Sequence, residues 1–233
     1  NVGVLFRGPE NALPPQWTHM PIGYNGRASS VVVSGTDIVR PMGQVRGENG
    51  PEWTACRRLD LELELGAIVG ADTPMGERLS VEDAERAIFG YVLLNDWSAR
   101  DIQAWEYQPL GPFLAKSFAS TVSPWIVTPE ALAPFRIAQP ARPQGDPAPL
   151  GYLLDERDQR TGAFDIELEV LILTERMRAA GHQPQRLALS STRHMYWTVA
   201  QMVAHHTSNG CNLQPGDLLG PGDGRLELRG SRG

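Results

Sequence analysis

The sequence predicts a strand-rich α+β fold. Its 233 residues, 41% of them hydrophobic, suffice for one large domain or two small ones with a sizeable core. Segments with strand-like alternation outnumber segments with helical spacing, and the two kinds do not alternate regularly along the chain. The 19 prolines and 24 glycines fit many turns and irregular connections. These observations favour a mixed sheet over a doubly wound parallel one.

Candidate strands are short runs rich in apolar and β-branched residues, some of them alternating with polar residues, between turn residues. The segments expected to form strands are residues 30–34, 59–69, 91–94, 124–127, 164–173 and 226–228. Residues 139–151 are rich in Pro and Gly, and we expect a surface loop there because strand-like sequence continues on both sides. No repeat or low-complexity tract divides the chain, so residues 1–233 are expected to form a single domain.

Three segments are expected to be helical: residues 81–88, 99–106 and 190–206. Ser80 with Asp83, and Ser98 with Asp101, have the spacing of capping boxes at the starts of the first two helices. In the third segment, apolar residues recur at helical spacing.

Composition excludes several classes of protein. The net charge is −6 and no basic tract is present, so neither a nucleic acid nor an anionic membrane is an expected partner. Apolar stretches such as residues 87–94, which Gly90 interrupts, are too short to span a bilayer, and no signal peptide is evident. The two cysteines make neither a disulfide framework nor a metal-binding spacing, which favours the cytoplasm.

The segment "LDLELELGAIVG", residues 59–70, alternates leucines with carboxylates. Side chains alternate across a strand, so Asp60, Glu62 and Glu64 would share one face. Carboxylates at i and i+2 lie about 7 Å apart and can reach one ion. Hard cations such as Mg²⁺ and Ca²⁺ prefer such oxygen ligands, whereas no His/Cys cluster indicates zinc. A half-buried strand with a solvated acidic face is the alternative.

A second segment repeats the pattern, so alternation alone does not decide. "FDIELEVLIL" places Asp165, Glu167 and Glu169 on one face. A metal site needs a further carboxylate converging from elsewhere, and Asp96 is the candidate because it follows the apolar run "YVLLN" and precedes a helix. Capping of that helix is the alternative role for Asp96.

The helix after Asp96 carries a polar stripe. Arg100, Gln103 and Tyr107 fall at i, i+3 and i+7, within about 60° of one another on a helix. A cation, an amide and a phenol beside a carboxylate suggest substrate handling, and a solvated polar face is the alternative. Lys116 follows a Gly-Pro turn and is the only lysine among 21 basic residues. That bias favours a role that arginine does not fill, although chance is the alternative.

Four blocks carry a resemblance to a known family: "FRGPENALPPQWTHMPIGYNGRASSVVVSGT", "LDLELELGAIVG", "GYVLLNDWSARDIQAWEYQPLGPFLAKSFASTVSPW" and "MYWTVAQMVAHHTSNGCNLQPGDLL". Over nearly the whole chain, the sequence resembles the catalytic domain of the fumarylacetoacetase family. The resemblance implies a mixed β-sandwich roll and a homodimer, with a smaller SH3-like N-terminal domain lying outside residues 1–233. It also implies an enzyme that hydrolyses a carbon–carbon bond in a 1,3-diketo acid, fumarylacetoacetate, in tyrosine and phenylalanine degradation.

The resemblance also implies roles for individual residues. The cation, Mg²⁺ or Ca²⁺, would be held by Glu62, Glu64 and Asp96, together with an aspartate from a segment before Asn1. A second possible cation would be bordered by Asp96, Lys116 and Ser120. The positions expected to contact substrate are Arg7, Tyr24, Gln103 and Tyr107. The positions expected to stabilise charge or orient the catalytic histidine are Arg100, Gln103, Lys116 and Glu227.

Two departures from the family pattern matter. The catalytic histidine and the aspartate-bearing segment would precede Asn1, and "GDLLGPGDGRLEL" lacks the Ser-Gly-Thr loop expected near the C-terminus. Either the protein is a degenerate relative or these residues are missing from the 233-residue chain, and the intact blocks favour the second. The role that the resemblance implies for Glu227 depends on the chain being continuous at Gly220–Pro221.

Other functions remain open from the sequence. A related enzyme, an acylpyruvate hydrolase or an oxo-acid decarboxylase, is one alternative. A non-catalytic metal- or ligand-binding relative without the histidine is the other. Cys211 and all five histidines of the chain are expected to be structural; the histidines are His19, His182, His194, His205 and His206.

Overall fold

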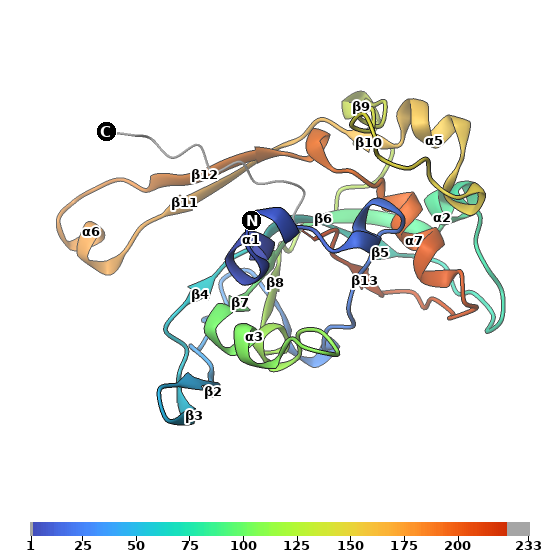
Figure 1. Ribbon diagram of the computed structural model, residues 1–233. Coiled ribbons are helices and arrows are strands. Elements are labelled where there is room, and N and C mark those ends of the chain that lie inside the picture. Colours follow the sequence, from blue (N-terminus) through green and yellow to red (C-terminus); the bar gives the residue numbers. More distant parts are fainter. Residues whose placement is uncertain (1, 223–233) are drawn as a thin grey trace.

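The computed structural model describes residues 2–222, and a five-stranded mixed sheet lies at its centre (Figure 1). The strand order is β1 (Val31–Val33), β8 (Ser120–Val122), β6 (Ile88–Asp96), β5 (Leu63–Val69) and β13 (Leu218–Leu219). β1 runs parallel to β8, and the other pairs are antiparallel. The predicted α+β class is confirmed.

Two helices, α2 (Val81–Ala87) and α7 (Val199–Thr207), pack against each other and against this sheet (Figure 1). The main core joins buried side chains of the sheet to those of the helices: Leu65, Ala67, Val69, Val81, Ala84, Ile88, Tyr91, Val199, Ala200, Val203 and Ala204. Burial of a side chain of this kind contributes about 1.5–3 kcal/mol for the larger residues, so this cluster fixes where β5 and β6 lie.

Four two-stranded ribbons surround the sheet. They are β2 (Met42–Gly47) with β3 (Gly50–Ala55), β4 (Leu59–Asp60) with β7 (Ser98–Ala99), β9 (Arg136–Ile137) with β10 (Ala163–Phe164), and β11 (Glu167–Ile172) with β12 (Gln185–Ser191). The β11–β12 ribbon extends away from the body of the molecule (Figure 1).

The remaining α-helices are short. They are α1 (Val2–Arg7), α3 (Arg100–Glu106), α4 (Leu114–Ser117), α5 (Glu156–Thr161) and α6 (Glu175–Ala179), which lies at the tip of the β11–β12 ribbon (Figure 1). Single 3-10 turns lie at Pro9–Asn11, Pro15–Thr18, Ala28–Ser30, Ala133–Phe135, Gly151–Leu153 and Thr192–His194. Within residues 2–222, no helix has the length and apolar character needed to cross a bilayer.

One predicted cap is confirmed and one is wrong. The Ser80 side chain accepts a hydrogen bond from the Asp83 N–H at the start of α2. Ser98 instead belongs to β7, so α3 begins after Ala99 without a side-chain cap. The Asp101 carboxylate accepts the Arg57 N–H at 2.7 Å, a contact across the fold that sequence spacing does not reveal.

The expected third helix, residues 190–206, was too long. Residues up to Ser191 belong to β12, and α7 begins only after Thr198. Thr198 and Gln201 form the capping box there, so the helix start is set by this pair.

Several predicted strands also differ from the structure. Residues 59–69 break into β4 and β5, and residues 164–173 divide between β10 and β11. Residues 124–127 form only a single bridge, Val127 with Tyr91, because the chain bends at Pro124, which has no N–H to donate to a neighbouring strand. Residues 226–228 lie outside the described residues. The loop at 139–151 is confirmed, and the β2–β3 hairpin was missed.

Candidate active site

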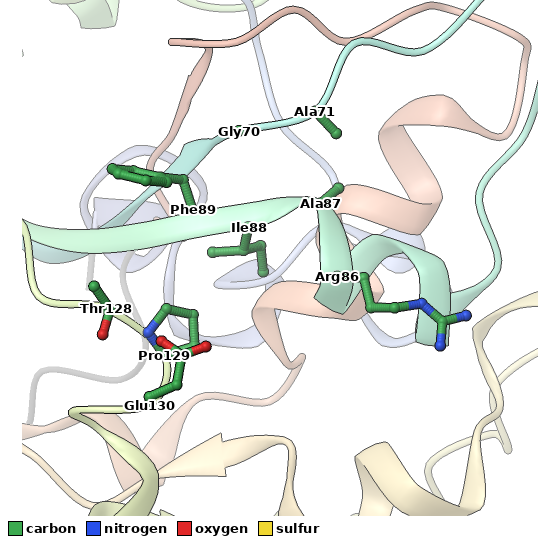
Figure 2. A pocket seen from close by; sticks show the side chains of 9 residues that line it. All are labelled: Gly70, Ala71, Arg86, Ala87, Ile88, Phe89, Thr128, Pro129 and Glu130. Carbon is green, nitrogen blue, oxygen red and sulfur yellow. The ribbon is translucent and has the colours of Figure 1, made fainter.

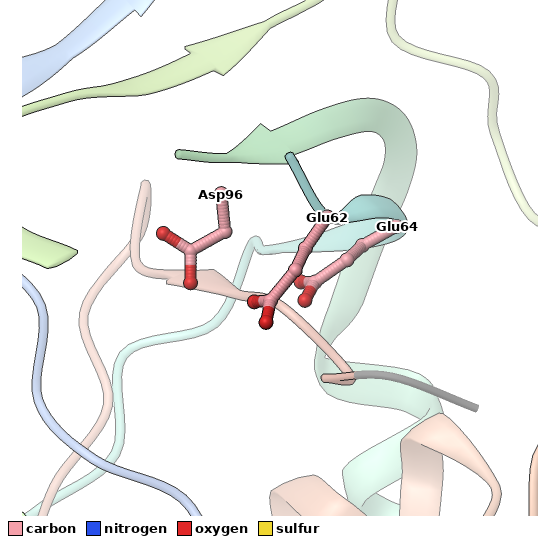
Figure 3. A group of neighbouring side chains, drawn as sticks. All are labelled: Glu62, Glu64 and Asp96. Carbon is pink, nitrogen blue, oxygen red and sulfur yellow. The ribbon is translucent and has the colours of Figure 1, made fainter. Parts of the chain in front are cut away.

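Three carboxylates converge at one end of the central sheet (Figure 3). Glu62, Glu64 and Asp96 each offer one oxygen, and these oxygens all lie within 4.8 Å of one another. Glu62 and Glu64 are buried, with 8% and 5% of their surfaces exposed. Because buried carboxylates repel one another, such a group requires cations close by.

The break in the predicted strand explains this convergence. Glu64 lies in β5, Asp96 ends β6, and the two strands pair with Leu63 opposite Asn95. Glu62 precedes β5, and its N–H donates to Asn95 Oδ1 at 3.2 Å. Its carbonyl accepts the Asp96 N–H at 2.9 Å. The backbone therefore places carboxylates of two neighbouring strands side by side.

Two buried cations offset part of this charge. Lys116 Nζ donates to Asp96 Oδ2 at 2.9 Å and is also ion-paired with Glu62 Oε2. Arg100 Nη2 donates to Glu62 Oε1 at 2.7 Å. Both side chains are almost fully buried, so water screens these pairs little. The chain's single lysine thus lies among the carboxylates.

Glu106, at the end of α3, positions α4 and therefore Lys116. Its Oε1 accepts the N–H groups of Phe113 and Ala115 at 2.9 and 2.8 Å, and its Oε2 accepts that of Leu114 at 3.2 Å. These N–H groups belong to the start of α4, where a negatively charged carboxylate also interacts favourably with the helix dipole. No sequence pattern predicted this role of Glu106.

Arg100 is held on three sides. In addition to Glu62, its Nε donates to Asp60 Oδ2 at 2.8 Å, and its Nη1 donates to Gln103 Oε1 at 2.9 Å. Burial alone would lower the pKa of the Arg100 guanidinium, but Glu62 and Asp60 together raise it. Because Gln103 accepts through its oxygen, its Nε2 group is the part available to donate to a ligand.

Tyr24 approaches the carboxylates from the N-terminal segment. Its hydroxyl donates to Asp96 Oδ2, and its ring centroid lies 5.9 Å from Lys116 Nζ. Burial, followed by the charge of Asp96, raises the pKa of Tyr24, so the phenol keeps its proton.

The three carboxylates, Arg100, Gln103, Lys116 and Tyr24 line one cavity of about 1050 Å³. Arg7, Tyr107 and Ser120 line it as well. Tyr107 stacks on Phe6 with ring centroids 5.4 Å apart. The Arg7 guanidinium donates to backbone carbonyls at residues 11 and 12, and Gly3, Phe6 and Arg7 of α1 line one part of the cavity.

The structure therefore brings the sequence-predicted residues that it describes around one space. They are Arg7, Tyr24, Glu62, Glu64, Asp96, Arg100, Gln103, Tyr107, Lys116 and Ser120. Glu227 lies outside the described residues. His206, which was expected to be structural, also lines the cavity, as does Gly220, which no sequence pattern indicated. A Cβ at Gly220 would clash with Glu64 Oε2, so the absence of a side chain there leaves room for the carboxylate.

The look-alike carboxylates do not converge on such a site. Glu167 and Glu169 are exposed on β11. Asp165, the first member of that pattern, is ion-paired with Arg193, whose Nε lies 2.7 Å from its Oδ1. The second copy of the pattern is therefore a solvated acidic face, as one of the two interpretations predicted.

A second, smaller cavity of about 350 Å³ lies at the opposite end of β6, beside Phe89 (Figure 2). Arg86 lines this cavity, and its guanidinium is ion-paired with Glu82 and Asp83. No group of converging carboxylates lines it, so the larger cavity is the candidate active site.

The donor set of the larger cavity suits a hard divalent cation. Its three candidate ligands are all carboxylates, and Mg²⁺ and Ca²⁺ prefer oxygen ligands, whereas zinc sites usually include His or Cys. The residues present therefore fit a bound metal.

A comparison with protein families gives the family directly. Residues 5–224 match the family described as "Fumarylacetoacetate (FAA) hydrolase C-terminal". The chain belongs to the fumarylacetoacetate hydrolase family. It is 54% identical to a fumarylacetoacetase of Dictyostelium discoideum over 226 residues, and 51% identical to a human fumarylacetoacetase over 224 residues. Each match covers 95% of this chain and 51% of the relative, so the chain spans about half the length of these relatives.

Solved structures agree on the fold. A fumarylacetoacetate hydrolase from Exiguobacterium antarcticum superposes with a TM-score of 0.51 at 22% identity, covering 85% of this chain and 52% of that one. A yeast protein of the same family gives a TM-score of 0.50 at 17% identity, covering 84% of this chain and 70% of that one. The expected family fold, a strand-rich mixed β-sandwich roll, is confirmed.

Proposed function

We propose that this chain is the catalytic domain of a metal-dependent hydrolase that cleaves fumarylacetoacetate into fumarate and acetoacetate. That reaction is the last step of tyrosine and phenylalanine degradation. The observation that carries the proposal is the buried group of Glu62, Glu64 and Asp96, ion-paired with Lys116 in a large cavity. The relatives named fumarylacetoacetase, at 50–54% identity, support it. We also propose that residues 1–233 form one such domain.

We assign Glu62, Glu64 and Asp96 as ligands of Mg²⁺ or Ca²⁺. When bound, the ion would supply a Lewis acid that polarises the carbonyl under attack. Ser120 lies opposite Asp96 in the β6–β8 pair, and with Lys116 it would border a second cation.

The diketo-acid substrate would lie across the same cavity. We assign Arg7 to its carboxylate, because a guanidinium pairs with a carboxylate through two parallel hydrogen bonds. Gln103 would donate through its Nε2 group, while Tyr24 from the N-terminal segment and Tyr107 at the end of α3 offer hydroxyl groups. Substrate binding would require Arg7 to exchange one of its backbone carbonyl contacts for the substrate.

Hydrolysis adds water across the carbon–carbon bond. A base removes a proton from water, the oxygen bonds to the carbonyl carbon, and the carbon–carbon bond breaks. The departing carbanion carries the electron pair and takes up a proton. We assign the stabilisation of this charge to Lys116, with Arg100 and Gln103, since preset donors act strongly in a buried site. A histidine oriented by Glu227 would be the base.

We further propose that the protein is a cytoplasmic homodimer. The β11–β12 ribbon supports a dimer, because a two-stranded ribbon is marginally stable alone. Leu171, Ile172, Leu187 and Leu189 are all at least 40% exposed on it. Size-exclusion chromatography with light scattering tests this, and a monomer at micromolar concentration would contradict it.

The activity is tested with the protein expressed from its complete gene. Turnover of fumarylacetoacetate is expected, with loss on EDTA treatment and recovery on adding Mg²⁺ or Ca²⁺. Faster cleavage of acylpyruvates, or decarboxylation of an oxo acid, would instead support a related enzyme of the family. Metal binding without turnover of any of these substrates would support a non-catalytic relative.

A further inference from the structure

We propose that Asp60 is a positioning residue that holds the Arg100 guanidinium against Glu62 and Gln103. The turnover measurement that tests this assignment rests on the proposed function. The measurement of metal affinity does not depend on which substrate the protein cleaves.

The contacts of Arg100 motivate the proposal. The guanidinium is planar and rigid, so its donors point in fixed directions. Asp60 accepts from Nε at 2.8 Å, while Nη2 and Nη1 reach Glu62 and Gln103 at 2.7 and 2.9 Å. Fixing Nε therefore orients both outer nitrogens. Gln103, held through its oxygen, then presents its Nε2 group to the cavity.

Asp60 is itself held by the fold. It ends β4, where it pairs with Ser98 of β7, two residues before Arg100. Its Oδ1 accepts the Leu61 N–H at 2.9 Å, which leaves Oδ2 for Arg100. The Arg100 N–H also donates to the Arg58 carbonyl at 2.9 Å. Backbone and side chain of Arg100 are thus both tied to the segment that carries Asp60.

Charge gives Asp60 a second effect. Glu62, Glu64, Asp96 and Asp60 carry four negative charges when ionised, and Arg100 and Lys116 carry two positive charges. The remaining two negative charges match one divalent cation. The Asp60 side chain is 48% exposed, however, so water screens its charge. Orientation of Arg100 is therefore the larger effect, and charge the smaller.

Loss of Asp60 is expected to weaken metal binding. A guanidinium released from Asp60 can turn both outer nitrogens onto Glu62 and compete with a cation for that carboxylate. Partners that orient metal ligands typically contribute about 10–100-fold to affinity.

Two substitutions separate orientation from charge. Asp60→Ala removes both the acceptor and the charge, whereas Asp60→Asn keeps an oxygen that can accept from Arg100 Nε. Asp165→Ala is the matched control, because Asp165 holds the corresponding place in the second carboxylate pattern and binds Arg193 there.

The experiment uses the protein expressed from its complete gene. Calorimetric titration measures its Ca²⁺ affinity, and unfolding in the presence of EDTA checks that each metal-free variant is folded. Asp60→Ala is expected to weaken Ca²⁺ binding about tenfold and to lower turnover by a similar factor. Asp60→Asn is expected to stay within about threefold of wild type, and Asp165→Ala to be unchanged.

Wild-type affinity in Asp60→Ala would overturn the proposal. An equal loss in Asp60→Asn and Asp60→Ala would also overturn it, since charge rather than orientation would then be responsible. An equal loss in Asp165→Ala would show a general effect of surface carboxylates and reject the role as well. Failure of the wild-type protein to bind Ca²⁺ or Mg²⁺ would instead refute the proposed function.

Discussion

Replacement of Lys116 by Met is expected to raise metal affinity while lowering turnover. The ammonium group donates to Asp96 at 2.9 Å and is ion-paired with Glu62, and both carboxylates are proposed metal ligands. A hydrogen bond to a charged group contributes about 1.5–3 kcal/mol. A metal ion bound to these carboxylates would weaken the Lys116 hydrogen bonds, by the equivalent of about half of one bond. Lys116→Met has no such bond to weaken, so its metal binding should be more favourable by about 1 kcal/mol, or roughly five- to tenfold tighter.

Turnover should change in the opposite direction. Lys116 is also the preset donor proposed to stabilise the carbanion, and loss of one such donor costs about 10²–10³ in kcat. Methionine keeps the length and packing of the side chain without its charge, and Lys116→Arg tests whether any cation suffices. Calorimetry with Ca²⁺ measures affinity, and the loss of fumarylacetoacetate absorbance measures turnover.

Two outcomes would refute this reasoning. Near-normal turnover in both variants would reject the catalytic role of Lys116. Weaker Ca²⁺ binding in Lys116→Met would show that the lysine supports the carboxylates rather than competing for them. The unfolding control is run with and without Ca²⁺, because Glu62 and Asp96 lose a buried cation in the metal-free variant, which costs about 3–5 kcal/mol.

Three further predictions concern substitutions at single positions. Asp96→Asn should weaken Ca²⁺ binding and turnover together, and activity that survives at ordinary metal concentrations would reject Asp96 as a ligand. Burial raises the pKa of Asp158 to about 6, so its ionisation costs stability as pH rises through the window from about 4 to 6. Asp158→Asn, which keeps an acceptor for Thr198 Oγ1, should gain about 1–2 kcal/mol in urea unfolding at pH 8 and less at pH 4.5; an equal gain at both pH values would contradict it. Gly220→Ala should weaken Ca²⁺ binding about tenfold by displacing Glu64, and unchanged affinity would show that the carboxylate has room.

The sequence predicted the fold class because local patterns report burial well. The apolar run at residues 91–94 marked a strand that lies at the centre of the sheet, and Ser80 marked the start of α2. The same reasoning failed at the start of α3, because Ser98 pairs with Asp60 across a ribbon. Pairing between distant segments overrode the local capping preference there.

Alternation also could not distinguish the two carboxylate patterns. Both predict an acidic strand face, and both meet cations from other segments. Only in the first are the carboxylates and their cations buried together, whereas Arg186 and Arg193 pair with the second pattern in exposed positions. The break between β4 and β5 turns Glu62 toward Asp96, and this break depends on pairing with two different partner strands. Contacts of that kind have no local sequence signal.

Some residues around the cavity were not predictable from spacing. Glu106 acts by accepting N–H groups of α4, and Gly220 acts by lacking a side chain beside Glu64. His206 sits on α7, far along the chain from the carboxylates, and was expected to be structural. The tertiary fold brings these positions together, and no motif in the sequence links them.

The most direct test compares the two carboxylate patterns in one titration. Ca²⁺ binding is measured by calorimetry for the wild-type protein, for the double variant Glu62→Gln with Glu64→Gln, and for the double variant Glu167→Gln with Glu169→Gln. The first pair is buried beside Asp96, whereas the second is exposed on β11, so binding should be lost only in the first variant. Equal loss in both variants, or loss only in the second, would contradict the assignment of the metal site.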